Sequence, residues 1–193
     1  MATSVLAVSS ASAADLVSNG GFPSGIADWH LVGRGSMAHS ADGSGAPGSL
    51  EIDGGLAGDA TQAVAGQCIS PVSPGQALEF EASVRVVSGS PANCRVALFE
   101  SDRDDCLWID LGAEVRRTTF STGWDNLAGG TLTTSVWTRS VEVRLHCANA
   151  GGDTDPLQVR FDNVAVNTTG VTDVIFSDGF ESGNTSAWSS VVP

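Results

Sequence analysis

The chain has 193 residues, which is enough for one domain with a sizeable hydrophobic core. Hydrophobic residues make up 41% and charged residues 16%, which excludes a charged disordered chain, and no apolar run reaches the ~18 residues of a spanning helix. Nine basic residues, all arginine, face 22 acidic residues, and the net charge of −13 argues against nucleic acid and anionic membranes as partners.

Residues 1–14 are interpreted as a signal-peptide remnant or a disordered N-terminus. A short apolar run, Val5–Val8, precedes the small residues Ser-Ala-Ser-Ala-Ala, which are typical of a signal cleavage site, but the basic start of a signal peptide is missing. The four cysteines are an even number and favour an oxidising compartment. We therefore expect the protein to be secreted or located at the cell surface.

Alternation of apolar and polar residues predicts β-strands along most of the chain, and no segment keeps a helical period. The clearest strand is Gln76–Ser88, where every second residue from Leu78 to Val86 is apolar. The other predicted strands are 29–32, 49–52, 60–64, 94–100, 114–120, 141–147 and 157–166. Glycine- and proline-containing segments separate them, which predicts an all-β fold, an antiparallel β-sandwich of about eight to ten strands with jelly-roll topology.

The sandwich is expected to span residues 15–168, followed by a linker and C-terminal tail at 169–193. The tail carries Gly179-Phe180-Glu181-Ser182-Gly183, a second copy of the G-F-x-S-G motif that begins at Gly21. The second copy could open a further domain or form a short tail used in sorting or anchoring.

The four cysteines are expected to form two disulfides, for which three pairings are possible. Cys94 and Cys106 flank a polar segment, 101–105, that would form the turn of a hairpin and bring the two cysteines face to face. The favoured pairing is therefore Cys94 with Cys106 and Cys68 with Cys147. A zinc site is the weaker alternative, since the sequence has no C-x-x-C pair.

Catalytic motifs are absent, so we do not expect an enzyme. The sequence has no G-x-S-x-G, H-E-x-x-H or phosphate-binding glycine loop. Glu79 and Glu81 share one face of a strand, where they are interpreted as its solvated side rather than as a glycosidase acid/base pair. The Asp102–Asp105 cluster lacks the glycine and glutamate of an EF-hand loop and predicts a turn.

Tryptophan is the residue type most suited to binding a ligand here, because an exposed indole can stack on the apolar face of a sugar ring. Trp108 lies two residues after Cys106, and Trp137 lies among hydroxyl residues beside Arg139. These three residues are the candidate carbohydrate-binding residues, and a structural role is the alternative for each tryptophan. Trp29 and Trp124 are expected to be structural.

Both ends of the predicted sandwich carry a family signal. The start reads Asn19-Gly20-Gly21-Phe22 with Trp29 following, the middle contains Val72-Ser73-Pro74-Gly75, and the last strand reads Phe161-Asp162-Asn163-Val164. These segments resemble bacterial carbohydrate-binding modules of the family 4/9/22 type, which have a galactose-binding-like jelly-roll fold. The resemblance covers about residues 15–167.

The resemblance also implies a structural calcium ion, held by the backbone carbonyl of Asn19 and the carboxylate of Asp162. Two positions depart from the family pattern. Pro23 replaces a glutamate that often binds the ion, and Ala82 replaces an aromatic residue of the central strand. The alternative role for Asp162 is to tie the last strand to the first by hydrogen bonds.

The resulting hypothesis is a non-catalytic, secreted module that attaches to a polysaccharide or glycan, as a monomer or as part of a larger secreted protein. Neither nucleic acid nor membrane insertion is expected. The alternative is a structural or adhesive cell-surface domain that has the same fold without a sugar site. A sugar-binding domain should expose at least two of Trp29, Trp108 and Trp137 on one face or at one loop end.

Overall fold

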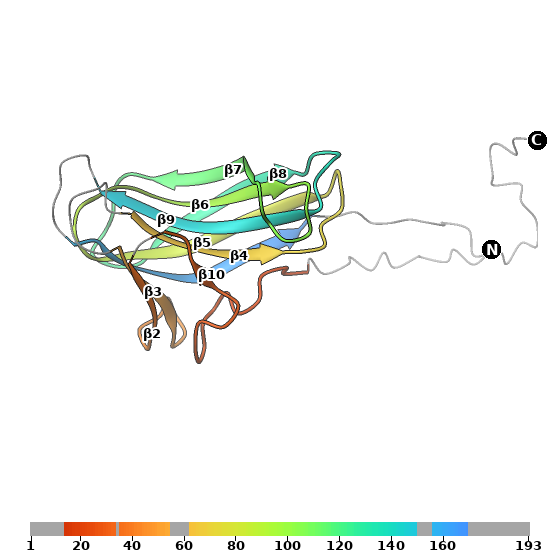
Figure 1. The fold of residues 1–193 in the computed structure, drawn as a ribbon. Coiled ribbons are helices and arrows are strands. Elements are labelled where there is room, and N and C mark those ends of the chain that lie inside the picture. The colour runs from red at the N-terminus through yellow and green to blue at the C-terminus, as the bar shows by residue number, and fades with distance from the viewer. Residues whose placement is uncertain (1–13, 34, 55–61, 150–155, 170–193) are drawn as a thin grey trace, which may run out of the picture.

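The computed structural model describes residues 14–33, 35–54, 62–149 and 156–169. Its strands are antiparallel and form two five-stranded sheets. One sheet has the order β1-β4-β9-β6-β7 and the other β2-β3-β10-β5-β8, and the two sheets lie face to face (Figure 1). The strands are β1 His30–Leu31, β2 Ser36–Ser40, β3 Ser49–Asp53, β4 Gln62–Ile69, β5 Ala77–Ser88, β6 Pro91–Ser101, β7 Asp110–Arg117, β8 Asp125–Thr133, β9 Ser140–Asn149 and β10 Gln158–Thr168. The expected all-β sandwich is confirmed.

The core lies between the sheets and follows from the two-residue period of the strands. On β6, Cys94, Val96 and Leu98 are fully buried, while the alternate residues point to the outer face of the sheet. β9 and β10 contribute in the same way, with Val143 and Phe161 among their fully buried residues. Within the described ranges, no helix has the length and apolar character that crossing a membrane requires.

Two strands were not predicted, β2 and β8, and β8 shows the reason most clearly. Its sequence contains Gly129 and Gly130, which indicate a loop when they are considered alone. In the structure the pairing of β8 with β5 shifts register between Phe80 and Ala82, and Gly129 there has a φ of +83°. A Cβ on Gly130 would lie 2.5 Å from the ring of Phe80, so glycine permits the close approach of β8 to the core.

The favoured disulfide pairing is wrong. The structure joins Cys68 to Cys106 and Cys94 to Cys147. Cys94 and Cys147 face each other directly in the register of β6 and β9, and both are fully buried. Cys106 is not on the strand that follows the turn, because β7 begins only at Asp110, so it cannot face Cys94 across a hairpin.

Disulfide mapping tests this connectivity directly. Trypsin cleaves after arginine and places the four cysteines in four different peptides, 35–85, 86–95, 104–116 and 145–160. Under non-reducing conditions we expect masses for 35–85 joined to 104–116 and for 86–95 joined to 145–160. A peptide pair that joins Cys94 to Cys106 would contradict the structure.

Replacing Cys94 and Cys147 together by alanine should lower the free energy of unfolding by about 4 kcal/mol, given the length of chain that the bond closes.

Candidate functional site

Three loops meet at one end of the sandwich. They follow β4, β6 and β8 and comprise residues 70–76, 102–109 and 134–139, which we call the loop end. Backbone hydrogen bonds join them: Val72 N donates to Arg139 O (2.8 Å), and Arg139 N donates to Ser101 O (2.8 Å). The three loops therefore form one hydrogen-bonded surface on top of the core.

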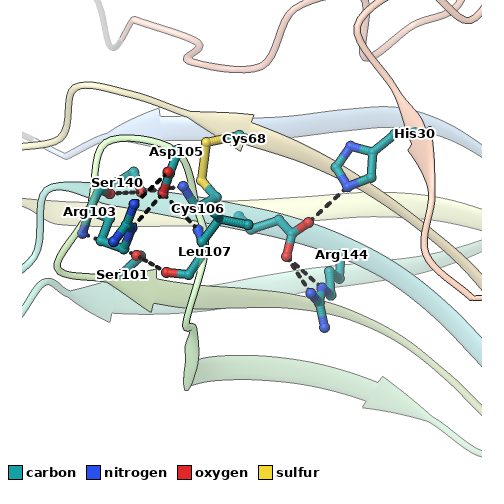
Figure 2. Close-up of a disulfide and its surroundings, with 10 residues drawn as sticks. His30, Cys68, Ser101, Arg103, Asp105, Cys106, Leu107, Ser140 and Arg144 are labelled. Atoms are coloured by element: carbon teal, nitrogen blue, oxygen red, sulfur yellow. Dashed lines mark hydrogen bonds and ion pairs between the residues drawn. A yellow bond between two sulfur atoms is a disulfide. The ribbon is translucent and has the colours of Figure 1, made fainter.

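The second of these loops, 102–109, crosses the end of β9 and is fastened to β4. Its Cys106 bonds to Cys68, as Figure 2 shows. Ser140, the first residue of β9, accepts a hydrogen bond from Cys106 N (3.3 Å) and donates one to Arg103 O (2.5 Å). Ser101 Oγ donates to Leu107 O (2.6 Å), so the loop is held at both sides of the disulfide.

Trp108 follows this fastened segment and is 83% exposed. Its φ of 58° lies in the left-handed region, as does that of Cys106 (54°). Non-glycine residues adopt this conformation at a cost of about 1–3 kcal/mol, and such residues concentrate at functional sites. The neighbouring Leu107 is also exposed. The backbone at Trp108 thus adopts an unfavourable conformation, and the large aromatic side chain is exposed to solvent.

Trp137 lies on the third loop, at the rim of an open hollow of about 630 Å³. The indole is 43% exposed, and the adjacent Val136 is 88% exposed. The hollow is lined by Pro71, Val72, Pro74, Asp102, Asp104, Val136, Trp137, Thr138 and Arg139. Trp137 and Arg139 therefore line one hollow, and Trp108 belongs to a loop that contributes to its wall.

Three charged side chains of this hollow lack hydrogen-bond and ion-pair partners among the described residues, whereas Thr138 bonds to Glu100. Among the described residues, the carboxylates of Asp102 and Asp104 and the guanidinium of Arg139 form no ion pair and no side-chain hydrogen bond. Unpaired donors and acceptors beside an exposed aromatic ring are the groups that hydroxyl-rich ligands require. The chemistry available here is binding by stacking and hydrogen bonding.

The outer face of the β1-β4-β9-β6-β7 sheet is a second polar surface, but its charges are paired with one another. Glu142 accepts from His30 Nε2 (3.0 Å) and from Arg144 Nε (2.6 Å). The guanidinium of Arg144 lies 4.7 Å from the centre of the Phe99 ring and covers that aromatic face. The sequence prediction missed this network, although the alternation of β9 placed its members on one face.

A neighbouring part of the same face contains His146. Arg95 Nε donates to His146 Nδ1 (3.1 Å), while Arg95 Nη1 donates to Glu114 (2.6 Å), which also pairs with Arg116 (2.7 Å). Burial, together with the nearby arginines, lowers the pKa of His146 to about 4. His146 is therefore neutral at pH 7, and its Nδ1 acts as an acceptor.

The two residues expected at a calcium site are Asn19, in a turn of the N-terminal segment, and Asp162, on β10. Asp162 is 1% exposed, and its carboxylate accepts from Ser44 N (2.6 Å) and Asn163 N (2.7 Å). Burial raises the pKa of Asp162 above its usual value, and the two backbone hydrogen bonds offset only part of this shift. The side chain of Asn19 donates to Gly25 O (2.9 Å). Asp162 forms no ion pair with a described cationic residue, so its buried charge fits a bound cation.

Trp29 and Trp124 have the structural positions expected of them, and Trp188 lies outside the described residues. Trp29 is 7% exposed and packs on Phe22, with ring centroids 5.5 Å apart. Trp124 is half-buried, beside the start of β8. Two of the three tryptophans named for a sugar-binding surface, Trp108 and Trp137, are thus exposed at the same loop end.

Comparisons with known proteins agree with this architecture. A family model described as a carbohydrate binding domain matches residues 14–153, so the chain belongs to this family of carbohydrate-binding modules. No curated protein matches the chain.

Solved structures with the same fold include both isolated modules and parts of enzymes. The CBM22-1 xylan-binding domain of Paenibacillus barcinonensis Xyn10C has a TM-score of 0.58 at 17% identity, covering 83% of this chain and 97% of that one. A family 16 carbohydrate-binding module has a TM-score of 0.56 at 18% identity, with coverages of 78% and 98%. An arabinose-bound α-L-arabinofuranosidase, MgGH51, has a TM-score of 0.62 at 16% identity, but the match covers 80% of this chain and only 26% of the enzyme.

His146 should make the stability of the protein depend on pH. Because its pKa is about 4 in the folded protein and 6.5 in the unfolded chain, the unfolded state binds the proton more readily between these values. The free energy of unfolding should fall as the pH drops from about 6.5 to about 4, by about 3 kcal/mol in total. Denaturant unfolding at several pH values should show a smaller fall for His146→Gln, whose amide oxygen can still accept from Arg95. Equal slopes for the two proteins would contradict the assignment.

Proposed function

We propose that this protein is a non-catalytic module that attaches to a polysaccharide through its loop end. The observation that carries the proposal is the exposure of Trp108 and Trp137 at the loop end, where Trp137 lines one hollow with the unpaired side chains of Asp102, Asp104 and Arg139. Stacking on indole faces and hydrogen bonds to hydroxyl groups are the two interactions that sugars offer to proteins. On the outer face of the β1-β4-β9-β6-β7 sheet, by contrast, the charged side chains pair with each other, and Arg144 covers Phe99.

The charge of the protein favours an uncharged polysaccharide. The hollow has two carboxylates and one guanidinium, and the whole chain carries a net charge of −13. Polysaccharides that contain uronic acids would be repelled by this field, whereas neutral chains would not. The structurally similar Paenibacillus barcinonensis module is a xylan-binding domain, which makes xylan the first neutral polymer to test.

The two disulfides support a location outside the cell or on its surface, because such bonds persist in oxidising compartments. We also propose that catalysis, where it accompanies this module, belongs to another domain of a larger protein. The matched part of MgGH51, 26% of that chain, illustrates such an arrangement in one enzyme.

Binding assays test the proposal with the full chain. Pull-down on insoluble xylan, cellulose and mannan, with polygalacturonate as the anionic comparison, should give saturable binding to at least one neutral polymer and none to polygalacturonate. Trp108→Ala and Trp137→Ala should each weaken that binding about tenfold or more, since they remove exposed stacking surfaces. Affinity gel electrophoresis with the soluble forms of the same polymers gives the dissociation constants.

Val87→Ala is the matched control, because Val87 is 40% exposed near the far end of β5. It should bind as the wild type does. If the folded, oxidised protein binds no polysaccharide, or if both tryptophan variants bind normally, the loop end is not a sugar site. A structural or adhesive surface domain would then be the better interpretation.

Calcium at Asp162 is a separate proposal. Among the described residues no three His, Cys, Asp or Glu side chains come together, so the ion would be held by Asp162 and backbone oxygens such as the carbonyl of Asn19. When bound, it would neutralise the buried carboxylate and fasten the N-terminal turn to β10. We expect a higher Tm in millimolar calcium than in chelator, and we expect Asp162→Asn to abolish this difference. Equal Tm values for the wild type would contradict the proposal.

A further inference from the structure

A buried carboxylate is hydrogen-bonded to the turn that carries Trp137. Glu100 is the last but one residue of β6 and continues the inward-facing series Cys94, Val96 and Leu98. An apolar residue would be expected at this position, yet the glutamate is only 6% exposed. Among the described residues no cationic side chain pairs with it. Burying a charge without a counter-ion costs several kcal/mol unless hydrogen bonds stabilise it.

The hydrogen bonds come from the loop that carries Trp137. Glu100 Oε1 accepts from Ser135 N (2.6 Å) and from Thr138 Oγ1 (2.5 Å), and Oε2 accepts from Ser135 Oγ (3.3 Å). Thr138 N donates to Ser135 O (3.1 Å), which closes the turn. The carboxylate therefore binds both ends of a four-residue turn, and the two residues between those ends are Val136 and Trp137.

These contacts make the conformation of the turn hard to change. Any movement that separates Ser135 or Thr138 from Glu100 leaves a buried carboxylate without donors, and hydrogen bonds to a charged group are the stronger ones. Thr138 is itself fully buried, whereas Val136 and Trp137 project into solvent. A side chain that is fixed before binding loses less conformational entropy when the ligand arrives.

We propose that Glu100 is the positioning residue of the glycan site: its buried carboxylate holds the 135–138 turn so that Trp137 is presented in a fixed orientation beside Asp102 and Arg139. The inference rests on the proposed function. Trp108 is held by a different set of contacts, the Cys68–Cys106 disulfide and the hydroxyls of Ser101 and Ser140. The two tryptophans are therefore held by different direct contacts, and Glu100 bonds only to the loop that carries Trp137.

The test is a double-mutant comparison with Glu100→Gln. This change keeps the shape of the side chain but removes its charge. It also replaces one acceptor oxygen by an amide N–H group, which cannot accept the hydrogen bonds that the turn donates. With xylan, or whichever neutral polymer the wild type binds, we expect Glu100→Gln to weaken affinity about tenfold. The same change should have no further effect in a Trp137→Ala background and its full effect in a Trp108→Ala background. Glu79→Gln, an exposed carboxylate on β5, is the matched control and should bind normally.

A second readout needs no ligand. The indole N–H resonances of Trp108 and Trp137 can be assigned from the Trp→Phe variants, and Glu100→Gln should shift or broaden that of Trp137 while leaving that of Trp108 unchanged. If Glu100→Gln fails to fold, Thr138→Val, which removes one donor to the carboxylate, should produce the same selective change to a smaller extent.

The outcomes separate the two proposals. An unchanged Trp137 resonance in folded Glu100→Gln, or an equal loss of affinity with and without Trp137, would overturn the role of Glu100. Absence of binding by the wild-type protein would instead overturn the proposed function, and the resonances would still decide whether Glu100 positions Trp137.

Discussion

Strand β6 links the core, the outer face of its sheet and the loop end, because each part of the strand has a different task. Its inward residues Cys94, Val96 and Leu98 fill the centre of the core, and Cys94 is bonded to Cys147 of β9. Its outward residues Arg95 and Phe99 join the charged network of the sheet. At the end of the strand, Glu100 and Ser101 bind the loops that carry Trp137 and Trp108. A shift of β6 by one residue would exchange all of these positions at once.

The loop end combines two ways of fixing a loop on a β-sandwich. The 102–109 loop is held by a covalent bond to β4, since Cys68 and Cys106 are joined across β9. The 134–139 loop is held by a buried charge, which requires its donors to stay in place. Both devices present an aromatic side chain without the help of a ligand, and this suits a binding site that must be rigid while lying on loops.

Charge pairing distinguishes the outer face of the β1-β4-β9-β6-β7 sheet from the hollow at the loop end. On the outer face of the β1-β4-β9-β6-β7 sheet, Glu142 is shared by His30 and Arg144, so the hydrogen-bonding capacity of these groups is largely used within the protein. In the hollow, the side chains of Asp102 and Arg139 form no hydrogen bond or ion pair with described residues and stay available. Removing water from an already paired charge costs free energy without creating a new partner, which is why we propose the unpaired groups as the binding surface.

The sequence by itself determined the fold class and most of the strands, because alternation with period two directly reflects burial on one face of a strand. It failed where glycine belongs to an irregular strand rather than to a turn, as at Gly129 of β8, which has a positive φ, and at Gly130, which lies close to Phe80. It also identified Trp108, Trp137 and Arg139 as candidates, since their chemistry is visible in their residue types.

Only the tertiary structure decided which cysteines meet and which polar groups stay unpaired. Cys94 faces Cys147 because β6 lies next to β9, a neighbour that is distant in sequence. The role of Glu100 depends in the same way on donors 35 and 38 residues away. Contacts of this kind arise from the arrangement of the strands in the sheets, and local patterns of residues carry no information about them.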